Sequence, residues 1–294
     1  MTGTSPKAIL IAGPTASGKS SFALDLARTR DGVIVNADSM QVYAELSVLT
    51  ARPTAEDEAA VPHRLYGHIR ARDPYSVARW QADVGAVVSR IASSGQLPII
   101  VGGTGLYFKA LTEGLSPVPA IPDDVRQQWR DAAEAAGPGE LHAILAAKDP
   151  VMAERLAPGD TQRITRALEV ISASGRSLAV WQTTPGTPLV KTDEAECLVV
   201  DRPREELHRR ADQRFDLMLA EGAIEEVELL RSQNLSPTLP AMRALGVAPL
   251  MAMIAGHISR KDAADQGKLE TRQYIKRQQT WLKRNMSTWK AINK

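Results

Sequence analysis

The chain has 294 residues, of which 44% are hydrophobic and 4% aromatic, and its formal net charge is +2. This length and composition fit a globular protein with one large α/β domain and an added part, or with two domains. The single cysteine, Cys197, excludes an internal disulfide framework and a multi-cysteine zinc site, and it suits a reducing compartment. No apolar run is long enough to span a membrane, so we expect a cytoplasmic protein without a membrane partner.

The segment from Ala8 to Leu26 predicts a short apolar strand, a polar loop and a helix. The loop matches G-x-x-x-x-G-K-[ST], the P-loop pattern, with strand and helix on the required sides. Such a loop directs backbone N–H groups and a helix N-terminus at two linked phosphates, while its lysine adds charge and its last hydroxyl can face Mg²⁺. The loop alone does not specify which diphosphate binds. The predicted site consists of Gly13, Pro14, Thr15, Ala16, Ser17, Gly18, Lys19 and Ser20.

Two further apolar runs, Gly32 to Ala37 and Leu97 to Val101, predict buried strands. Between them lie a charged connection at residues 55–65 and a predicted helix at residues 76–93. Like the P-loop strand, both strands end in polar or glycine-rich turns, which favours a parallel sheet. Because ligands of such sheets gather beyond the carboxyl ends of the strands, we expect these turns to lie beside the P-loop.

Each of these two turns offers a candidate functional side chain. Asp38 follows the first strand directly, where a carboxylate can be a magnesium-shell ligand, a general base or a helix N-cap. Ser39 and Gln41 would then face polar edges of a substrate. In the second turn, Gly103 permits close backbone approach and Thr104 can donate to a phosphate or a base, although such turns also merely end strands.

A helical insertion is predicted after a run with three prolines. Residues 123–182 show helical periodicity with glycine and proline breaks and no strand, so residues 116–195 are predicted to form an all-helical domain. Residues 1–115 and 196–294 would form the core, in which a strand at Cys197 to Val200 resumes the sheet. Inside the insertion, Asp160 is a predicted N-cap before basic residues that suit either RNA or solvent.

From Glu205 onward the sequence predicts helices to the end of the chain, interrupted by a loop at residues 234–240. Arg214 lies beside the apolar stripe of the first helix and can turn inward as a bidentate diphosphate clamp or outward into solvent. Residues 257–294 hold ten Lys and Arg against three Asp and Glu. This basic end is a candidate nucleic-acid contact, although a solvated helix face has the same composition.

Several segments together resemble the tRNA dimethylallyltransferases, also called tRNA isopentenyltransferases. A P-loop alone is shared by many nucleotide enzymes, whereas the whole set, in the family's order and across nearly the entire chain, is highly specific. The segments are GPTASGKS at 13–20, DSMQVY at 38–43, PHRL at 62–65, GGTGLY at 102–107, DTQRITRALEV at 160–170, QRFDLML at 213–219, LPAMRALG at 239–246 and TRQYIKRQQTWL at 271–282.

The resemblance implies a P-loop NTPase-like α/β fold that binds dimethylallyl diphosphate instead of ATP and transfers the dimethylallyl group to N6 of the adenosine 3′ to a tRNA anticodon. It implies that Lys19 and Arg214 stabilise the leaving pyrophosphate and that Ser20 lies near Mg²⁺. It also implies that Asp38 takes the N6 proton, with Thr104 near the reacting centre. The residues implied to contact RNA are Asp38, Ser39, Met40, Gln41, Thr104, Arg126, Gln162, Arg163, Ile164, Thr165 and Arg166.

Three positions depart from the family's pattern: Leu49 and Val247 replace a common glycine and tyrosine, and Arg52 replaces a common lysine. These changes put loop geometry in doubt and leave the proposed base and P-loop untouched. Three other functions use the same loop. They are prenylation of free AMP, which needs neither the insertion nor a basic last helix, phosphorylation of a small molecule by ATP, and RNA binding without catalysis. We expect a monomer, because no additional apolar face is evident.

Overall fold

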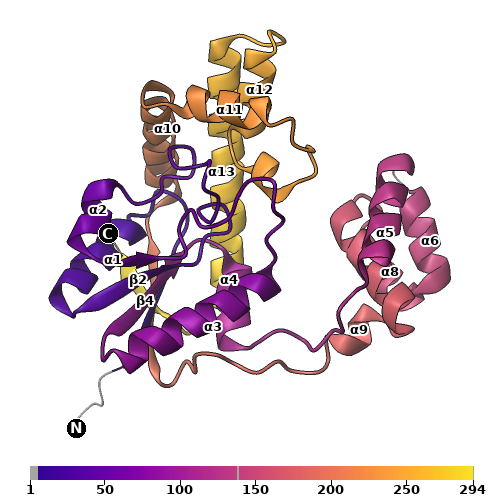
Figure 1. Ribbon diagram of the computed structural model, residues 1–294, viewed down its shortest axis with the longest axis horizontal. Helices are drawn as coiled ribbons and strands as arrows, with labels where there is room; N and C mark the ends of the chain where they lie inside the picture. The colour runs from indigo at the N-terminus through magenta and orange to yellow at the C-terminus, as the bar shows by residue number, and fades with distance from the viewer. Residues whose placement is uncertain (1–5, 138, 294) are drawn as a thin grey trace. The chain divides into compact units, whose positions relative to one another are not determined.

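The computed structural model describes residues 6–137 and 139–293. The chain divides into two compact units (Figure 1). One unit combines the residues before Glu113 with those after Pro188, and the other is Glu113–Pro188. The second unit is therefore inserted into the first, and its bounds lie at 113 and 188 where the sequence predicts 116 and 195.

A parallel sheet of six strands forms the centre of the first unit, which confirms the predicted α/β fold class. The strand order is β3-β2-β4-β1-β5-β6, and each neighbouring pair is parallel. The P-loop strand β1 thus lies inside the sheet, between β4 and β5. The strands are β1 (Ala8–Ala12), β2 (Gly32–Asn36), β3 (His63–Arg64), β4 (Leu97–Gly102), β5 (Ala195–Asp201) and β6 (Lys290–Asn293).

Both faces of the sheet are buried, because the side chains of β1 alternate between two hydrophobic cores. Ile9 and Ile11 pack with Ala23 of helix α1 (Lys19–Thr29). Leu10 points to the other face and belongs to the core that contains Trp80 of helix α3 (Val77–Ser93). Burial of each large aliphatic side chain stabilises the fold by about 1.5–3 kcal/mol, which explains why β1 is entirely apolar.

Helix α3 shows how local sequence defines a helix in this protein. The Ser76 side chain accepts the N–H of Arg79 at 3.2 Å and so caps the first turn. The buried residues then recur at three- and four-residue steps and form one face, which confirms the predicted helix. These residues are Trp80, Val84, Val87 and Ile91.

The carboxyl-terminal part of the first unit is mainly helical, as predicted. Helices α10 and α13 pack together, and α13 also reaches the P-loop, since Gln278 accepts a hydrogen bond from Thr15. The helices of this unit from residue 105 onward are α4 (Gly105–Thr112), α10 (Arg204–Ala220), α11 (Ala223–Ser232), the 3₁₀ helix η1 (Pro240–Arg243), α12 (Val247–Ile254) and α13 (Arg260–Asn285).

Three short elements differ from the sequence predictions. The charged connection at residues 55–65 contains helix α2 (Ala55–Ala60), whose first turn is stabilised by a capping box between Thr54 and Asp57. Strand β3 follows this helix. The sequence predicts helix to the end of the chain, whereas the residues after α13 form β6, which pairs with β5. Strands β3 and β6 are the two edges of the sheet. Such short edge strands need few apolar residues and leave little signal in a sequence.

The second unit is all-helical over its described residues, in agreement with the predicted character of the insertion. Its own core includes Trp129, whose indole N–H donates to Ser172 Oγ at 3.0 Å, and the fully buried Leu145 and Leu168. The helices are α5 (Asp123–Ala135), α6 (Glu140–Lys148), α7 (Pro150–Arg155), α8 (Thr161–Ser174) and α9 (Leu178–Trp181).

Candidate active site

The P-loop connects β1 to α1 through a backbone that needs small residues. Gly18 has a φ of 89° immediately before α1, and Ala16 also has a positive φ, of 66°. At Gly13 a Cβ would lie 2.5 Å from the carbonyl oxygen of Val200, so any larger residue would push the loop away from β5. The glycine pattern therefore reflects both the turn itself and its close contact with the sheet.

The loop's hydrogen bonds leave an open row of donors. The N–H groups of Gly13, Thr15 and Ser17 donate to Gly102, Gln278 and Pro14 respectively. Among the hydrogen bonds of the described residues, none uses the N–H groups that follow along the loop and the first turn of α1. These donors, together with the positive end of the helix dipole, form an anion-binding nest. The open donors belong to Ala16, Gly18, Lys19, Ser20 and Ser21.

Two arginines hold this nest from the carbonyl side of the loop. Arg202, just after β5, donates from Nε to the carbonyl oxygen of Ser17 at 2.9 Å. Arg210 of α10 donates from Nε to the carbonyl oxygen of Ala16, also at 2.9 Å. Because these carbonyls point to the arginines, the neighbouring N–H groups are free to point elsewhere. No local pattern indicates this role, since each arginine is more than 180 residues away from its loop partner along the chain.

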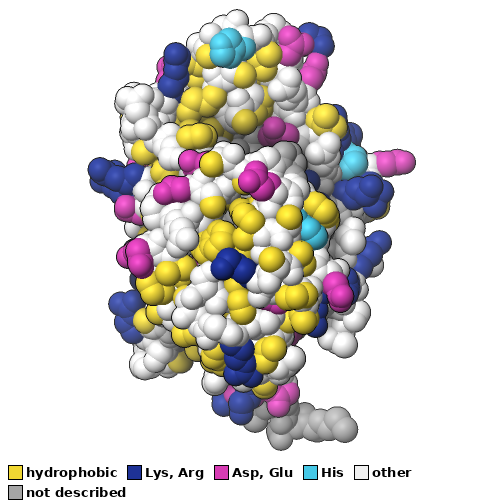
Figure 2. Space-filling view, turned by 90° about the vertical axis from the view of Figure 1, so that its right-hand side faces the viewer, with side chains coloured by type: hydrophobic (Ala, Val, Ile, Leu, Met, Phe, Trp, Pro, Cys, Tyr) yellow, Lys and Arg dark blue, Asp and Glu magenta, His cyan; other side chains and the backbone are white. Residues whose placement is uncertain are grey.

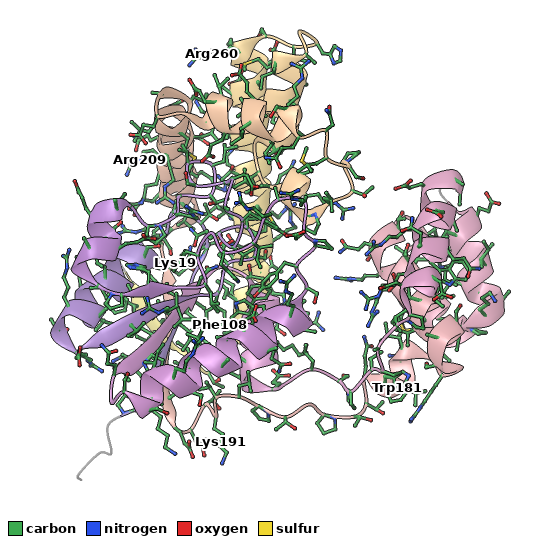
Figure 3. All side chains as sticks on the ribbon, viewed as in Figure 1. Lys19, Phe108, Trp181, Lys191, Arg209 and Arg260 are labelled. Atoms are coloured by element: carbon green, nitrogen blue, oxygen red, sulfur yellow. The ribbon has the colours of Figure 1, made fainter. Side chains whose placement is uncertain are left out.

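Lys19, the lysine of the P-loop, is the first residue of α1 (Figure 3). Its Nζ donates to the carbonyl oxygen of Pro14 at 3.2 Å. Burial lowers the pKa of Lys19 to about 8, the negative charge of Asp38 opposes this change, and the positive charge of Arg214 adds to it. Asp38 and Arg214 are therefore both close enough to Lys19 to act on its charge.

Arg214 of α10 lies near enough to the P-loop for its positive charge to act on Lys19. Its side chain is partly buried in α10, and burial together with the nearby Arg210 lowers its pKa. Three guanidinium groups, those of Arg202, Arg210 and Arg214, and the ammonium group of Lys19 thus lie around one loop. A protein gathers such mutually repelling cations where an anion binds between them.

Asp38 lies in a polar turn beyond β2, and no helix begins there. Its Oδ1 accepts the N–H of Met40 at 2.9 Å, and its own N–H donates to the Asn36 side chain at 2.8 Å. The next described helix after this turn begins at Ala55, so the helix N-cap interpretation of Asp38 is excluded. One carboxylate oxygen holds the turn, which leaves the other for a ligand.

Thr104 joins Asp38 at the same end of the sheet, as the parallel topology predicts. Its Oγ1 accepts the N–H of Ser39 at 2.9 Å and donates to the Ser39 hydroxyl at 3.3 Å. The Tyr274 hydroxyl also bonds to Thr104, and burial and the charge of Asp38 raise the pKa of Tyr274. Tyr274 of α13 is thus a member of the site that the sequence does not predict.

The charge of Asp38 also acts on two other tyrosines, Tyr66 and Tyr107. Burial and then Asp38 raise the pKa of both Tyr66 and Tyr107. Tyr107 also stacks on Trp80 with ring centroids 4.2 Å apart. The charge of Asp38 thus acts on three tyrosines that come from separate segments of the chain.

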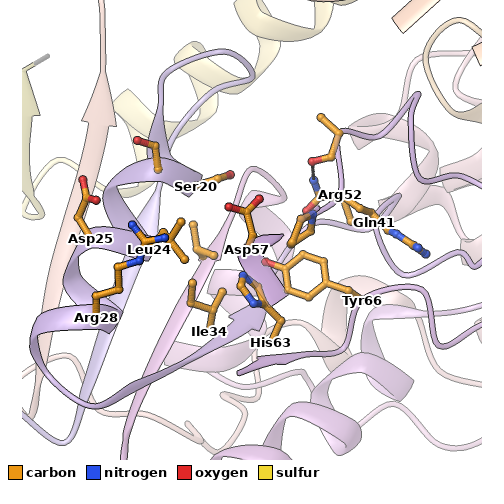
Figure 4. Close-up of a pocket in the computed structure, with 14 residues that line it drawn as sticks. Ser20, Leu24, Asp25, Arg28, Ile34, Gln41, Arg52, Asp57, His63 and Tyr66 are labelled. Atoms are coloured by element: carbon orange, nitrogen blue, oxygen red, sulfur yellow. Dashed lines mark hydrogen bonds between the residues drawn. The ribbon is translucent and has the colours of Figure 1, made fainter. Parts of the chain in front are cut away.

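A cavity of about 310 Å³ opens beside the first turns of α1 (Figure 4). Ser20 lines it and also belongs to the anion-binding nest. Gln41 lines it too, but its Nε2 donates to the carbonyl oxygens of Thr50 and Ala51, so its amide oxygen is the atom it can offer to a substrate. The cavity provides space for a small ligand next to the loop.

In the insertion, helix α8 carries five of the predicted RNA residues. Asp160 accepts the N–H of Arg163 at 3.3 Å, which confirms the predicted N-cap, and the side chain of Arg163 is 76% exposed. Arg166 pairs with Glu169 at 3.1 Å. Ile164 is fully buried among the apolar residues of this unit, so the expectation that its side chain contacts RNA is wrong.

Other predicted RNA residues differ in their availability. Gln162 is exposed, whereas Thr165 is half-buried and donates its hydroxyl to the carbonyl oxygen of Thr161 at 2.8 Å. Arg126 of α5 has a buried Nε without a hydrogen-bond partner among the described residues. Met40 is partly buried against the core of the first unit. Side-chain exposure therefore makes the exposed polar residues better candidates for RNA contact than Met40.

Two basic residues of α13 are paired with acidic residues of α10. Lys268 contacts Asp216 at 2.6 Å, and Arg272 binds both carboxylate oxygens of Asp212, at 2.8 and 2.9 Å. On the face drawn in Figure 2, Lys and Arg are interspersed with Asp and Glu. The basic end of the sequence is thus partly neutralised by α10, and it makes a weaker candidate for RNA than its composition indicates.

Two negative findings apply to the described residues. Within them, no three His, Cys, Asp or Glu side chains are grouped as a metal site would require. No helix there combines the length and the apolar character that crossing a membrane takes.

Comparison with known proteins gives a consistent family. A family model described as IPP transferase matches residues 41–285, and one described as isopentenyl transferase matches residues 6–72. A tRNA dimethylallyltransferase of Parvibaculum lavamentivorans is 52% identical over 98% of this chain and 91% of its own length. One from Agrobacterium fabrum is 49% identical over 97% of this chain and 96% of its own.

Solved structures agree with the sequence relatives. The full-length tRNA isopentenylpyrophosphate transferase of Bacillus halodurans is 30% identical, with a TM-score of 0.70 over 98% of this chain and 90% of that one. A eukaryotic dimethylallyltransferase, in structures described as acting on tRNA, is 26% identical with a TM-score of 0.84 over 98% of this chain and 74% of that one. The chain therefore belongs to the IPP transferase family, the family of the tRNA dimethylallyltransferases.

Proposed function

We propose that this protein transfers the dimethylallyl group of dimethylallyl diphosphate to N6 of the adenosine 3′ to a tRNA anticodon, with release of pyrophosphate. One observation supports this most strongly: the anion-binding loop and the turn that carries Asp38 follow parallel strands at the same end of the sheet, where the charges of Asp38 and Arg214 both act on Lys19. A diphosphate cradle and a carboxylate thus share one site. That combination suits a reaction in which a diphosphate leaves while a proton is removed nearby.

In this reaction the P-loop with Lys19 and Arg214 acts on the leaving diphosphate, and Asp38 acts on the attacking adenine. The N6 lone pair forms a bond to the first carbon of the allyl group as the bond from that carbon to the diphosphate oxygen breaks. The pyrophosphate keeps the electron pair, and the open N–H donors with Lys19 and Arg214 stabilise its charge. Asp38 accepts the N6 proton, and Thr104 lies beside it. Because these groups are already in place, little reorganisation is needed during transfer.

Mg²⁺ is the cation that we propose for the diphosphate. The donor set fits it, because the Ser20 hydroxyl is exposed at the start of α1 next to the anion nest. Magnesium sites of this kind use few protein ligands and take the remainder from phosphate oxygens and water. When bound, the ion neutralises part of the diphosphate charge.

We propose that the insertion, predicted as residues 116–195, contacts the anticodon stem-loop. Exposed Gln162 and Arg163 at the start of α8 suit phosphates and base edges. In the first unit, the turn that follows β2 would receive the adenine once it has left the stack of the loop. The residues proposed to contact RNA are Asp38, Ser39, Met40, Gln41, Thr104, Arg126, Gln162, Arg163, Thr165 and Arg166.

We also propose a monomer that acts in the cytoplasm, where its RNA substrate is made and used. Light scattering of the pure protein should then give a mass near 31.9 kDa. A dimer mass would contradict the monomer and leave the proposed reaction untouched.

The test compares acceptors in one assay with dimethylallyl diphosphate labelled in its five-carbon group. The protein is incubated with the labelled donor and unmodified tRNA, with the labelled donor and AMP, or with ATP and candidate nucleoside acceptors in place of the labelled donor. We expect label in tRNA and none in AMP. Label in AMP alone would show an adenylate prenyltransferase instead, and ATP-dependent phosphorylation of an added nucleoside would show a kinase.

A further inference from the structure

Gln278 lies buried in the second half of α13, and both the oxygen and the nitrogen of its amide group are hydrogen-bonded. The side chain is 5% exposed. Its Oε1 accepts the N–H of Thr15 at 2.8 Å, and its Nε2 donates to the carbonyl oxygen of Gly103 at 3.0 Å. One partner is a donor and the other an acceptor, so a carboxamide satisfies both at once. This side chain joins the last helix to the two loops that carry the proposed chemistry.

The first bond controls the peptide unit between Pro14 and Thr15. The N–H of this unit binds Gln278, and its carbonyl oxygen accepts the ammonium of Lys19 at 3.2 Å. Because a peptide unit is planar, fixing its N–H also fixes the direction of its C=O. Gln278 therefore helps to set where the Lys19 ammonium rests in the loop.

The second bond controls the peptide unit between Gly103 and Thr104. Gln278 binds its carbonyl oxygen, and its N–H donates to the carbonyl oxygen of Ala37 at 3.2 Å. Ala37 directly precedes Asp38. A Cβ at residue 103 would lie 2.3 Å from Gln278 Nε2, so glycine there leaves room for the amide. The same side chain thus reaches the backbone on both sides of the site.

On the basis of the proposed function, we infer that Gln278 is a positioning residue that fixes the separation between the diphosphate cradle and the base. It touches neither substrate, and it acts through the two planar peptide units. A displacement of about 1 Å between reacting groups can reduce a rate by about 100-fold, and loss of both bonds would permit a shift of that size. The alternative is that the Gln278 side chain only packs between α13 and the two loops.

Three variants separate these roles. Gln278→Met keeps the volume and removes both hydrogen bonds. Gln278→Glu keeps the acceptor for Thr15 and regains a donor for Gly103 when the carboxyl is protonated, which burial favours. Thr271→Val is the matched control, because this buried residue of α13 likewise exchanges a polar for an apolar side chain, but its hydroxyl donates only within the helix, to the carbonyl oxygen of Gly267 at 2.8 Å.

The experiment measures kcat for tRNA prenylation by each variant, at a temperature where melting curves show every protein folded. We expect kcat to fall about 100-fold in Gln278→Met, with a smaller change in the KM for tRNA, and to stay near wild type in Thr271→Val. The ratio of Gln278→Glu to wild-type kcat should rise as the pH falls from about 8.5 to about 6. A residue that only packs would not produce this pH-dependent rescue.

Two results would overturn the inference alone, with the wild type active. They are a Gln278→Met kcat within about threefold of wild type, and a Gln278→Glu ratio that does not change with pH. If Gln278→Met fails to fold, the Gln278→Glu ratio decides. A wild-type protein that transfers no label to tRNA would instead overturn the proposed function, and this inference with it.

Discussion

Replacing Asp38 by asparagine tests its role as the base with little change in shape. Oδ1 of Asp38 accepts the Met40 N–H at 2.9 Å, and the asparagine oxygen can make the same bond, worth about 1 kcal/mol. The turn and the melting temperature should therefore be retained. Asparagine cannot accept the N6 proton, so we expect the rate of transfer to fall by about 10²–10⁴-fold, the usual contribution of a general base.

The assay is a single-turnover transfer from labelled dimethylallyl diphosphate to unmodified tRNA, with tRNA affinity measured separately. Affinity should change little in Asp38→Asn, because no cation that faces RNA is removed. Asp31→Asn at the opposite end of β2 is the matched control. This exposed residue accepts a bond from Gln96 and has a φ of 47°, which asparagine tolerates. Transfer by Asp38→Asn within a few-fold of the Asp31→Asn rate would refute Asp38 as the base.

Three further expectations follow from the site and its supports. Since the pKa of Lys19 is lowered to about 8, kcat/KM for dimethylallyl diphosphate should fall as pH rises through about 8, and the residual activity of Lys19→Arg should lack this fall. Arg163→Ala should weaken tRNA binding and reduce the slope of log affinity against log salt by about one, and an unchanged slope would make Arg163 an ordinary solvated residue. Gly102→Ala would place a Cβ 2.0 Å from the Ala37 carbonyl oxygen and should lower the unfolding free energy by about 1–3 kcal/mol in denaturant titrations, whereas Gly137→Ala, with open space around it, should not.

Local rules account for what the sequence predicts correctly. The P-loop, the strands β1, β2, β4 and β5, and helix α3 depend on runs of neighbouring residues, which a sequence displays directly. The meeting of Asp38 with Thr104 follows from one topological rule, because parallel strands bring their carboxyl ends to the same edge.

The rest of the site depends on contacts between distant segments. Gln278 and Tyr274 lie on the buried face of α13, and their helical spacing indicates packing rather than an engaged amide or hydroxyl. Arg202 and Arg210 bind loop carbonyls that no local pattern connects to them. Likewise, pairing of the basic α13 with acidic residues of α10 cannot be seen from the charge count of one segment.

One misassigned residue carried a usable signal. Ile164 is fully buried, and Ala167 and Leu168 follow it at the three- and four-residue steps of an apolar helix face. Periodicity alone therefore places its side chain in the core of the insertion. The family motif covers every residue from Gln162 to Arg166, whereas a helix exposes only part of each turn, so not all of these side chains can face RNA.

The position of the transferred group tests the central claim most directly. Unmodified tRNA is incubated with the protein and dimethylallyl diphosphate, digested to nucleosides and short oligonucleotides, and analysed by mass spectrometry. The account predicts one added dimethylallyl group on N6 of the adenosine 3′ to the anticodon, and none in a tRNA with guanosine at that position. A dimethylallyl group at another nucleoside, or no transfer to tRNA at all, would contradict it.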